Sequence, residues 1–127
     1  MSSGESWRRL LDTSAVIKLM REQLAAPPHT CVSVITHGEL RAGAIKSRDP
    51  ERELQRIDST LAGTRLLAPT AATIAVYAEI WLELELKGRR INANDLWNAA
   101  LAIEHDLELH GLDQHFEHIS RLRYVRV

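Results

Sequence analysis

Short apolar runs alternate along this chain with longer amphipathic segments, and that alternation constrains the fold more than any other feature. The runs expected to form strands span residues 8–11, 30–35, 65–68, 107–110 and 123–127. Apolar residues at helical spacing predict helices over about 13–20, 36–49, 50–62, 70–87 and 94–106. Strands that alternate with helices indicate βαβ units, in which helices cover both faces of a parallel sheet. We therefore expect an α/β fold with a doubly wound parallel sheet.

Length and composition indicate one globular domain. The chain has 127 residues, of which 45% are hydrophobic and 26% charged, and its single Cys31 excludes an internal disulfide. No apolar stretch is long enough to span a membrane, so we expect a cytoplasmic protein without a membrane partner. We expect residues 1–9 to form a flexible N-terminal extension and residues 10–127 to form the domain.

The charge balance disfavours a simple basic nucleic-acid binder. Sixteen Lys and Arg residues face 17 Asp and Glu residues, which gives a net charge of −1. If four of the acids were neutralised by two divalent ions, the formal charge would rise to +3. The position of the acids therefore matters more than the total charge.

Four acids occupy positions at which a doubly wound sheet brings side chains together. Asp12 ends the first expected strand, Glu39 lies about one turn into the helix after the second strand, Asp95 lies at a helix start, and Asp113 follows the strand over 107–110. Such strand ends meet at the ligand-binding edge of the sheet. Four carboxylates repel one another unless a cation is present, and Mg²⁺ or Mn²⁺ prefers oxygen ligands. Two such ions could activate a water and stabilise phosphoryl displacement.

Each acid also has a purely structural explanation. Asp12 and Asp95 could cap the helices that follow them, Asp113 could be a turn residue, and Glu39 could lie on a solvated helix face. Position alone leaves both explanations open.

Three spaced segments resemble a known family. LLDTSAVIKLM (10–20), SVITHGELRAGA (33–44) and INANDLWNAALAIEHDL (91–107) are similar, in this order, to the signature segments of PIN-domain ribonucleases. More narrowly, they resemble the VapC toxins of bacterial type II toxin–antitoxin pairs. The resemblance extends from about Leu10 to the C-terminus. It implies a PIN-like fold in which Asp12, Glu39 and Asp95 are catalytic metal ligands and Asp113 is a more variable fourth.

The resemblance also implies an activity. A VapC-like chain would be a Mg²⁺-dependent endoribonuclease, in which Mn²⁺ can substitute, that hydrolyses tRNA or rRNA with a metal-activated water and so inhibits translation. It would act as a homodimer and be neutralised by a VapB-type antitoxin. Thr13 and Ser14 match small hydroxyl residues that would hydrogen-bond to a ligand or phosphate, and Asn98 could reach a water at the metal site or cap a neighbouring group. VapC-like chains usually carry Thr or Ser at the position of Gly111, so this position departs from the pattern.

Basic and aromatic residues suggest where RNA and a second subunit could bind. We expect Arg41, Arg89 and Arg90 to contact RNA, because cations follow Glu39 and precede Asp95. We expect most apolar residues of the long helix over 70–87 to be core, so that loss of Trp81 would cost stability, with a remainder available to a dimer interface.

Two alternatives from other classes remain. His110, His115 and His118 could form a zinc site with Asp113, or could act as acid and base in a metal-free ribonuclease that uses the RNA 2′-hydroxyl. A noncatalytic PIN-like scaffold that binds RNA or a partner is favoured by Gly111 and opposed by the three matching acids. The first strand is not followed by a glycine-rich phosphate loop, which disfavours a nucleotide-binding enzyme.

Overall fold

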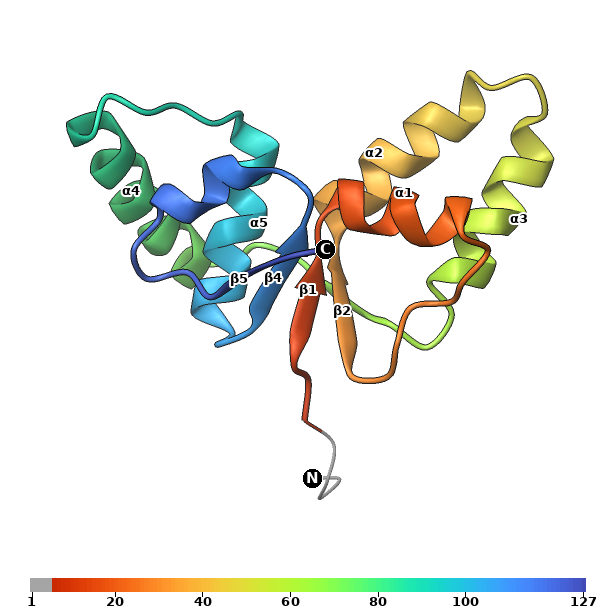
Figure 1. Ribbon diagram of the computed structural model, residues 1–127, viewed down its shortest axis with the longest axis horizontal. Coiled ribbons are helices and arrows are strands. Elements are labelled where there is room, and N and C mark those ends of the chain that lie inside the picture. Colours follow the sequence, from red (N-terminus) through yellow and green to blue (C-terminus); the bar gives the residue numbers. More distant parts are fainter. Residues whose placement is uncertain (1–5) are drawn as a thin grey trace.

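A five-stranded parallel sheet forms the centre of the computed structural model, which describes residues 6–127 (Figure 1). The strands are β1 (Arg9–Leu11), β2 (Thr30–Ser33), β3 (Arg65–Leu67), β4 (Glu108–Gly111) and β5 (Tyr124–Arg126). Their order is β3-β2-β1-β4-β5, and each neighbouring pair is parallel. The predicted doubly wound α/β fold is confirmed.

Helices cover both faces of this sheet (Figure 1). They are α1 (Thr13–Arg21), α2 (Val34–Ile45), α3 (Pro50–Thr60), α4 (Ala71–Leu86) and α5 (Ala93–Glu104). A short 3₁₀ helix, η1 (Gln114–His118), follows β4 and was not predicted from the sequence. Helices α1, α2 and α3 pack on one face, and α4 and α5 pack on the other.

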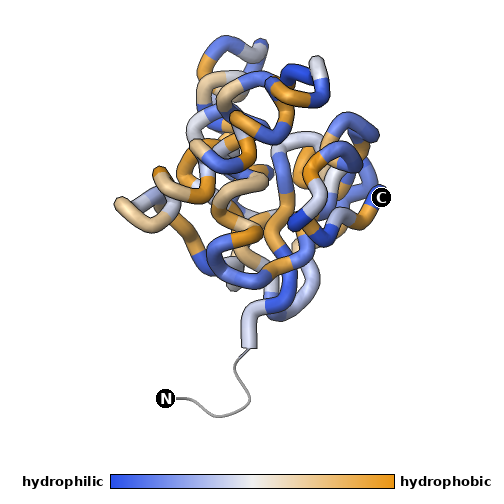
Figure 2. Tube along the Cα trace, turned by 90° about the vertical axis from the view of Figure 1, so that its left-hand side faces the viewer, coloured by the Kyte–Doolittle hydropathy of each residue, from blue (hydrophilic) through white to orange (hydrophobic). Residues whose placement is uncertain are grey.

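The central strands β1 and β2 are buried on both faces, which explains why they show apolar runs rather than alternation. Leu10 and Cys31 belong to the core under α4 and α5, whereas Leu11 and Val32 belong to the core under α1, α2 and α3. Helices α1 and α3 are amphipathic by contrast, and Figure 2 shows hydrophobic and hydrophilic stretches alternating along the chain. Burial on two faces therefore fixes these strands in the middle of the sheet.

Two helices begin earlier than the sequence predicted. The side chain of Ser33, not Thr36, caps α2, and its Oγ accepts a hydrogen bond from the Thr36 amide (3.1 Å). The side chain of Asn92, rather than Asn94 or Asp95, caps α5 by accepting from the Asp95 amide (2.8 Å). Glu39 consequently lies in the second turn of α2, and Asp95 is the third residue of α5.

The strand order creates a switch point between β1 and β4. From β1 the chain proceeds outward to β2 and β3, and it later returns to the other side of β1 to form β4 and β5. Asp12 directly follows β1, and Asp113 lies two residues after β4. Ligands of such folds bind at the carboxyl ends of the strands beside this point, so both acids lie at the expected place.

The N-terminal boundary lies close to the first strand. Residues 1–5 of the expected extension over residues 1–9 lie outside the described residues. Within the described part, Trp7 packs against the core and Arg9 already pairs with Thr30. No helix within residues 6–127 has both the length and the apolar character needed to cross a membrane.

The expectation that Trp81 is core is wrong. Only one face of α4 packs against the domain, and it contains the buried Ile80 and Leu84. Trp81 lies on another face and is 51% exposed. Ile74 (58% exposed) and Leu82 (53% exposed) are also largely accessible to solvent. The apolar residues of α4 therefore exceed what the core of one chain can bury.

Candidate active site

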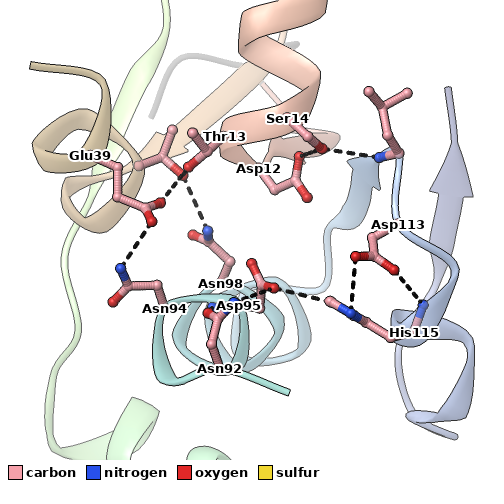
Figure 3. Close-up of polar contacts among 12 residues, drawn as sticks. Asp12, Thr13, Ser14, Glu39, Asn92, Asn94, Asp95, Asn98, Asp113 and His115 are labelled. Carbon is pink, nitrogen blue, oxygen red and sulfur yellow. Dashed lines mark hydrogen bonds and ion pairs between the residues drawn. The ribbon is translucent and has the colours of Figure 1, made fainter. Parts of the chain in front are cut away.

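The four acids gather at one edge of the sheet, although they come from four parts of the chain (Figure 3). Burial raises the pKa of Asp95, and the negative charges of Asp12, Glu39 and Asp113 raise it further. Contacts join the segments that carry these acids, because His115 lies 3.1 Å from both Asp95 and Asp113, and Asn94 beside Asp95 donates to Glu39. The structure thus brings together the four residues that the sequence singled out.

Asp12 is both a helix cap and part of this cluster. Its Oδ1 accepts hydrogen bonds from the Ser14 hydroxyl (2.7 Å) and the Ala15 amide (2.9 Å), which stabilise the start of α1. The Leu112 amide donates to Ser14 Oγ (3.1 Å), so the loop after β4 is joined to α1. The side chain of Asp12 is 3% exposed, and this burial raises its pKa although both hydrogen bonds oppose the rise. The two explanations for Asp12 are therefore compatible.

Glu39 is held between two other helices. Its Oε1 accepts a hydrogen bond from Thr13 Oγ1 of α1 (2.5 Å), and its Oε2 accepts one from Asn94 Nδ2 of α5 (3.0 Å). These two bonds hold the Glu39 carboxylate beside the start of α1 and the start of α5, although the residue is exposed to solvent (Figure 3). Thr13 therefore contacts one of the acids, as expected of a hydroxyl residue at this position.

Asn98 is buried below the cluster and bonds none of the four acids. Its Oδ1 accepts from Ser33 Oγ (2.5 Å), and its Nδ2 donates to Thr36 Oγ1 (3.1 Å). Thr36 Oγ1 also lies 3.2 Å from Thr13 Oγ1, whose hydroxyl donates to Glu39. Asn98 therefore acts on the cluster through two threonine hydroxyls and the cap of α2.

His115 lies between Asp95 and Asp113. Its Nε2 is 3.1 Å from Asp95 Oδ2, and its Nδ1 is 3.1 Å from Asp113 Oδ2. Asp113 Oδ1 accepts from the His115 amide (3.0 Å), and Asn92 Nδ2 donates to Asp95 Oδ2 (3.0 Å). A charged imidazole here lowers the pKa of Asp95, opposing the effect of burial. The sequence placed His115 with Asp113 only in a possible zinc site or as an acid–base residue, and did not predict its contact with Asp95.

The donor chemistry of the cluster fits a hard divalent ion. Carboxylate oxygens are the ligands that Mg²⁺ and Mn²⁺ prefer, and an ion would offset the repulsion that raises the pKa of Asp95. Within residues 6–127, however, no group of three or more Asp, Glu, His or Cys side chains is arranged so that it could hold a metal ion. Asp95 and Asp113 both face His115 instead. Binding would therefore require these carboxylates to turn from their present partners.

Comparison with known proteins agrees with this arrangement. The family profile described as "PIN domain" matches residues 9–122. Ribonuclease VapC4 of Mycobacterium tuberculosis is 35% identical over 100 residues, covering 76% of this chain and 75% of the relative. The chain belongs to the PIN domain family, among the VapC ribonucleases.

Other VapC relatives match over nearly the full length. Ribonuclease VapC1 of Haemophilus influenzae (strain R2866) is 29% identical over 127 residues, covering 91% of this chain and 94% of the relative. The solved structure of VapBC from Salmonella typhimurium bound to DNA superposes with a TM-score of 0.85 and 26% identity, covering 94% of this chain and 98% of that one. The VapC resemblance seen in three segments of the sequence is thus confirmed, and so is the PIN-like fold.

The three arginines expected to contact RNA lie in different surroundings of this PIN domain. Arg89 and Arg90 line a pocket together with Asp113, His115 and His118, directly beside the cluster. Arg90 also lies 3.7 Å from Glu85, and both side chains reach solvent. Arg41 instead pairs with Asp58 of α3 (3.6 Å). The geometry therefore favours Arg89 and Arg90 as neighbours of a bound ligand.

The histidines do not form one group in this VapC chain. His110 Nε2 lies 3.1 Å from Glu108 Oε1, whereas His115 faces Asp95 and Asp113. In the part of the chain that the structure describes, no three side chains are therefore placed to bind the zinc ion of the alternative hypothesis. Of the three histidines, His115 is the one that contacts the acids.

Sequence analysis missed several polar residues of the site. Asn92 could have been found, because it stands three residues before Asp95, a spacing at which a cap and its partner bond each other. Thr36 was expected to cap α2, not to link Thr13 and Asn98. Tyr124 had no local signal, because its place depends on how β5 pairs with β4.

Proposed function

We propose that this chain is a divalent-metal-dependent endoribonuclease toxin that hydrolyses phosphodiester bonds of tRNA or rRNA and thereby inhibits translation. The observation that carries the proposal is the gathering of four carboxylates at the switch point of the sheet, where three of them raise the pKa of Asp95. The names of the VapC relatives support ribonuclease activity. We expect Mg²⁺ to be the physiological ion and Mn²⁺ to replace it.

The residues of the chain have separate tasks in this proposal. Asp12, Glu39, Asp95 and Asp113 would hold the metal, which would lower the pKa of a water and stabilise charge on the reacting phosphate. Ser14 and the Ala15 amide fix Asp12 Oδ1. Thr13 and Asn94 fix both oxygens of Glu39. Their bonds keep the two carboxylates in place before the substrate arrives, which lowers the cost of binding an ion.

RNA would approach along the pocket beside Asp113. Arg89 and Arg90 line this pocket, and their charges would offset backbone phosphates next to the scissile bond. The amino ends of α1 and α5 also meet at the cluster, and helix N-termini favour anionic groups. A contact of Arg41 with RNA stays a prediction, because its neighbour in the structure is Asp58.

Partners follow from the relatives and from α4. Solved structures of the relatives are described as VapBC complexes, which supports a VapB-type antitoxin as the partner of this chain. We also propose a homodimer, because α4 exposes the apolar residues Ile74, Trp81, Leu82 and Leu86. Action on tRNA or rRNA would place the protein in the cytoplasm.

Cleavage of purified RNA tests the proposal. Antitoxin-free protein would be incubated with total tRNA and rRNA in Mg²⁺, in Mn²⁺ and in EDTA, beside Asp95→Asn and the matched control Asp106→Asn. Asp106 is an exposed acid that pairs with Arg123 before β4, at the opposite end of the sheet. We expect discrete cleavage by the wild type and Asp106→Asn, and none in EDTA or with Asp95→Asn. Equal cleavage by Asp95→Asn would contradict the proposal. If the folded wild type cuts no RNA, the noncatalytic scaffold becomes the better explanation.

A further inference from the structure

The hydroxyl of Tyr124 is buried and has no hydrogen-bond partner within the described residues. Leaving such a group without a partner is costly, so buried hydroxyls are seldom left unpaired without a reason. The ring itself is well held, because it packs against Phe116 with 5.0 Å between the ring centroids. A fixed ring with an unpaired polar end suggests a partner that lies close by.

Strand register directs this hydroxyl toward Asp12. Tyr124 pairs with Leu109, and Leu109 pairs with Leu10, so all three side chains share one face of the sheet. Gly111 and Asp12 follow two residues further along the neighbouring strands, on the same face. Two residues of strand rise about 6.6 Å, a length that a tyrosine side chain can span. The ring therefore extends along β4 toward the carboxyl end of the sheet.

Gly111 leaves the space in which the two groups meet. A Cβ atom at this residue would overlap Oδ2 of Asp12 and would lie 2.8 Å from Tyr124 Oη. Both the carboxylate oxygen and the phenol oxygen thus lie too close to this point for a methyl group to fit, and the absence of a side chain at Gly111 lets them approach each other. Oδ2 is also the oxygen of Asp12 that accepts neither the Ser14 nor the Ala15 bond, since both go to Oδ1.

The phenol stays protonated beside these acids. Even in solution a tyrosine hydroxyl keeps its proton up to about pH 10, so it is a hydrogen-bond donor over the pH range in which carboxylates ionise.

We propose that Tyr124 is a positioning residue of the acidic cluster, whose hydroxyl moves into the space above Gly111 and donates a hydrogen bond to Asp12 Oδ2. Ser14 and Ala15 fix one oxygen of this carboxylate, and Tyr124 fixes the other. The part of the inference that concerns metal affinity rests on the proposed function, whereas the hydrogen bond itself does not. It also explains how this chain dispenses with the hydroxyl side chain expected at position 111.

The chain has two tyrosines, which makes the test direct. Tyr77 stacks on Trp97 with centroids 4.2 Å apart, so Tyr77→Phe is a matched control for Tyr124→Phe. Full-length protein labelled with ¹³C at the tyrosine ζ-carbon would give two NMR signals, which the two variants assign. The signals would be compared between the metal-free wild type and Asp12→Asn, and Mg²⁺ affinity would be measured by calorimetry for the wild type and both tyrosine variants. Circular dichroism would confirm that each variant is folded.

We expect the Tyr124 signal to shift in Asp12→Asn while the Tyr77 signal stays in place. We also expect Tyr124→Phe to weaken Mg²⁺ binding by roughly tenfold, the lower limit for loss of a group that orients a ligand, and Tyr77→Phe to leave it unchanged. A Tyr124 signal that is identical in the wild type and Asp12→Asn would overturn the inference, and so would unchanged Mg²⁺ affinity in Tyr124→Phe. If the wild type binds no Mg²⁺, the metal-dependent function fails, and the NMR comparison alone decides the hydrogen bond.

Discussion

Nε2 of His115 lies 3.1 Å from Oδ2 of Asp95, and the other ring nitrogen faces Asp113 at the same distance. An imidazole from η1 thus stands between two carboxylates that belong to different elements of the fold. When it is protonated, it offsets part of the repulsion in the cluster, and it lowers the pKa of Asp95 while burial and the other acids raise it. The ionised cluster nonetheless destabilises the metal-free protein, because the net shift of Asp95 is upward.

Replacement of Asp95 by Asn should therefore stabilise the metal-free protein. The neutral amide removes one partly buried charge from the cluster, so we expect a higher free energy of unfolding at neutral pH. Denaturant unfolding in EDTA measures it. Mg²⁺ should then stabilise the wild type but not Asp95→Asn, since a ligand stabilises the state that binds it. A less stable Asp95→Asn protein in EDTA would contradict the account.

The same cluster makes stability depend on pH. Burial raises the pKa values of Asp12 and Asp95 above their ordinary 3.8. At pH values between the ordinary pKa and the raised pKa, the folded state therefore binds more protons than the unfolded state. Stability in EDTA should consequently fall as the pH rises from about 4 through the raised values. The difference in the free energy of unfolding between Asp95→Asn and the wild type should be near zero at about pH 4. It should then increase with pH until it reaches a plateau. Unfolding curves at several pH values test this, and an advantage that shrinks with rising pH would refute it.

Gly111→Ala tests how tightly the end of β4 packs against the cluster. The added Cβ would overlap Asp12 and lie 2.8 Å from Tyr124 Oη, so one of the two side chains must move. We expect a loss of about 2 kcal/mol of stability, typical of overpacking. Gly38→Ala is the matched control, because nothing lies within 4 Å of a Cβ there. Thermal unfolding measures the midpoint of each variant. Equal midpoints for Gly111→Ala and Gly38→Ala would show that Asp12 and Tyr124 do not pack against Gly111 as the structure has them.

The sequence was sufficient to predict the sheet, the five helices and the four acids, but not the contacts among the side chains. Apolar runs that are buried on two faces, such as Leu10 and Leu11, leave a strong local signal. The Asp12 carboxylate could be placed because it follows a central strand. The position of Tyr124 near Asp12, by contrast, is set by the pairing of β5 with β4, which brings together residues that are 112 positions apart. The faces of α4 were also ambiguous, because its apolar residues surround the helix, and Trp81 was misplaced for that reason.

Asn98 should matter for stability more than for metal binding. Its side chain is buried and bonds Ser33 and Thr36, so Asn98→Ala leaves two buried hydroxyls short of a partner. We expect a loss of about 2 kcal/mol or more. Because Asn98 contacts none of the acids directly, Mg²⁺ affinity should change much less than in Asp95→Asn. Calorimetry on the folded variant decides this, and a loss of affinity as large as that of Asp95→Asn would place Asn98 among the metal ligands.

Trp81→Ala should affect assembly rather than folding of the subunit. Trp81 is 51% exposed, and exposed substitutions usually change stability by less than ~0.5 kcal/mol. Ile80→Ala, one residue earlier in the buried face of α4, should cost about 2–4 kcal/mol. Light scattering after size exclusion should show a weaker dimer for Trp81→Ala. A normal dimer combined with a large loss of stability would mean that Trp81 belongs to the core of the subunit.

The chemistry of the new RNA ends tests the central claim most directly, because the acidic cluster and His115 would leave different products. A water activated at the four carboxylates leaves a 5′-phosphate and a 3′-hydroxyl, whereas attack by the RNA 2′-hydroxyl leaves a 2′,3′-cyclic or 3′-phosphate. Fragments made by the antitoxin-free wild type in Mg²⁺ would be tested for ligation that requires a 5′-phosphate. We expect every cut to carry a 5′-phosphate. Cyclic or 3′-phosphate ends, formed equally in EDTA, would contradict the account and assign the reaction to His115.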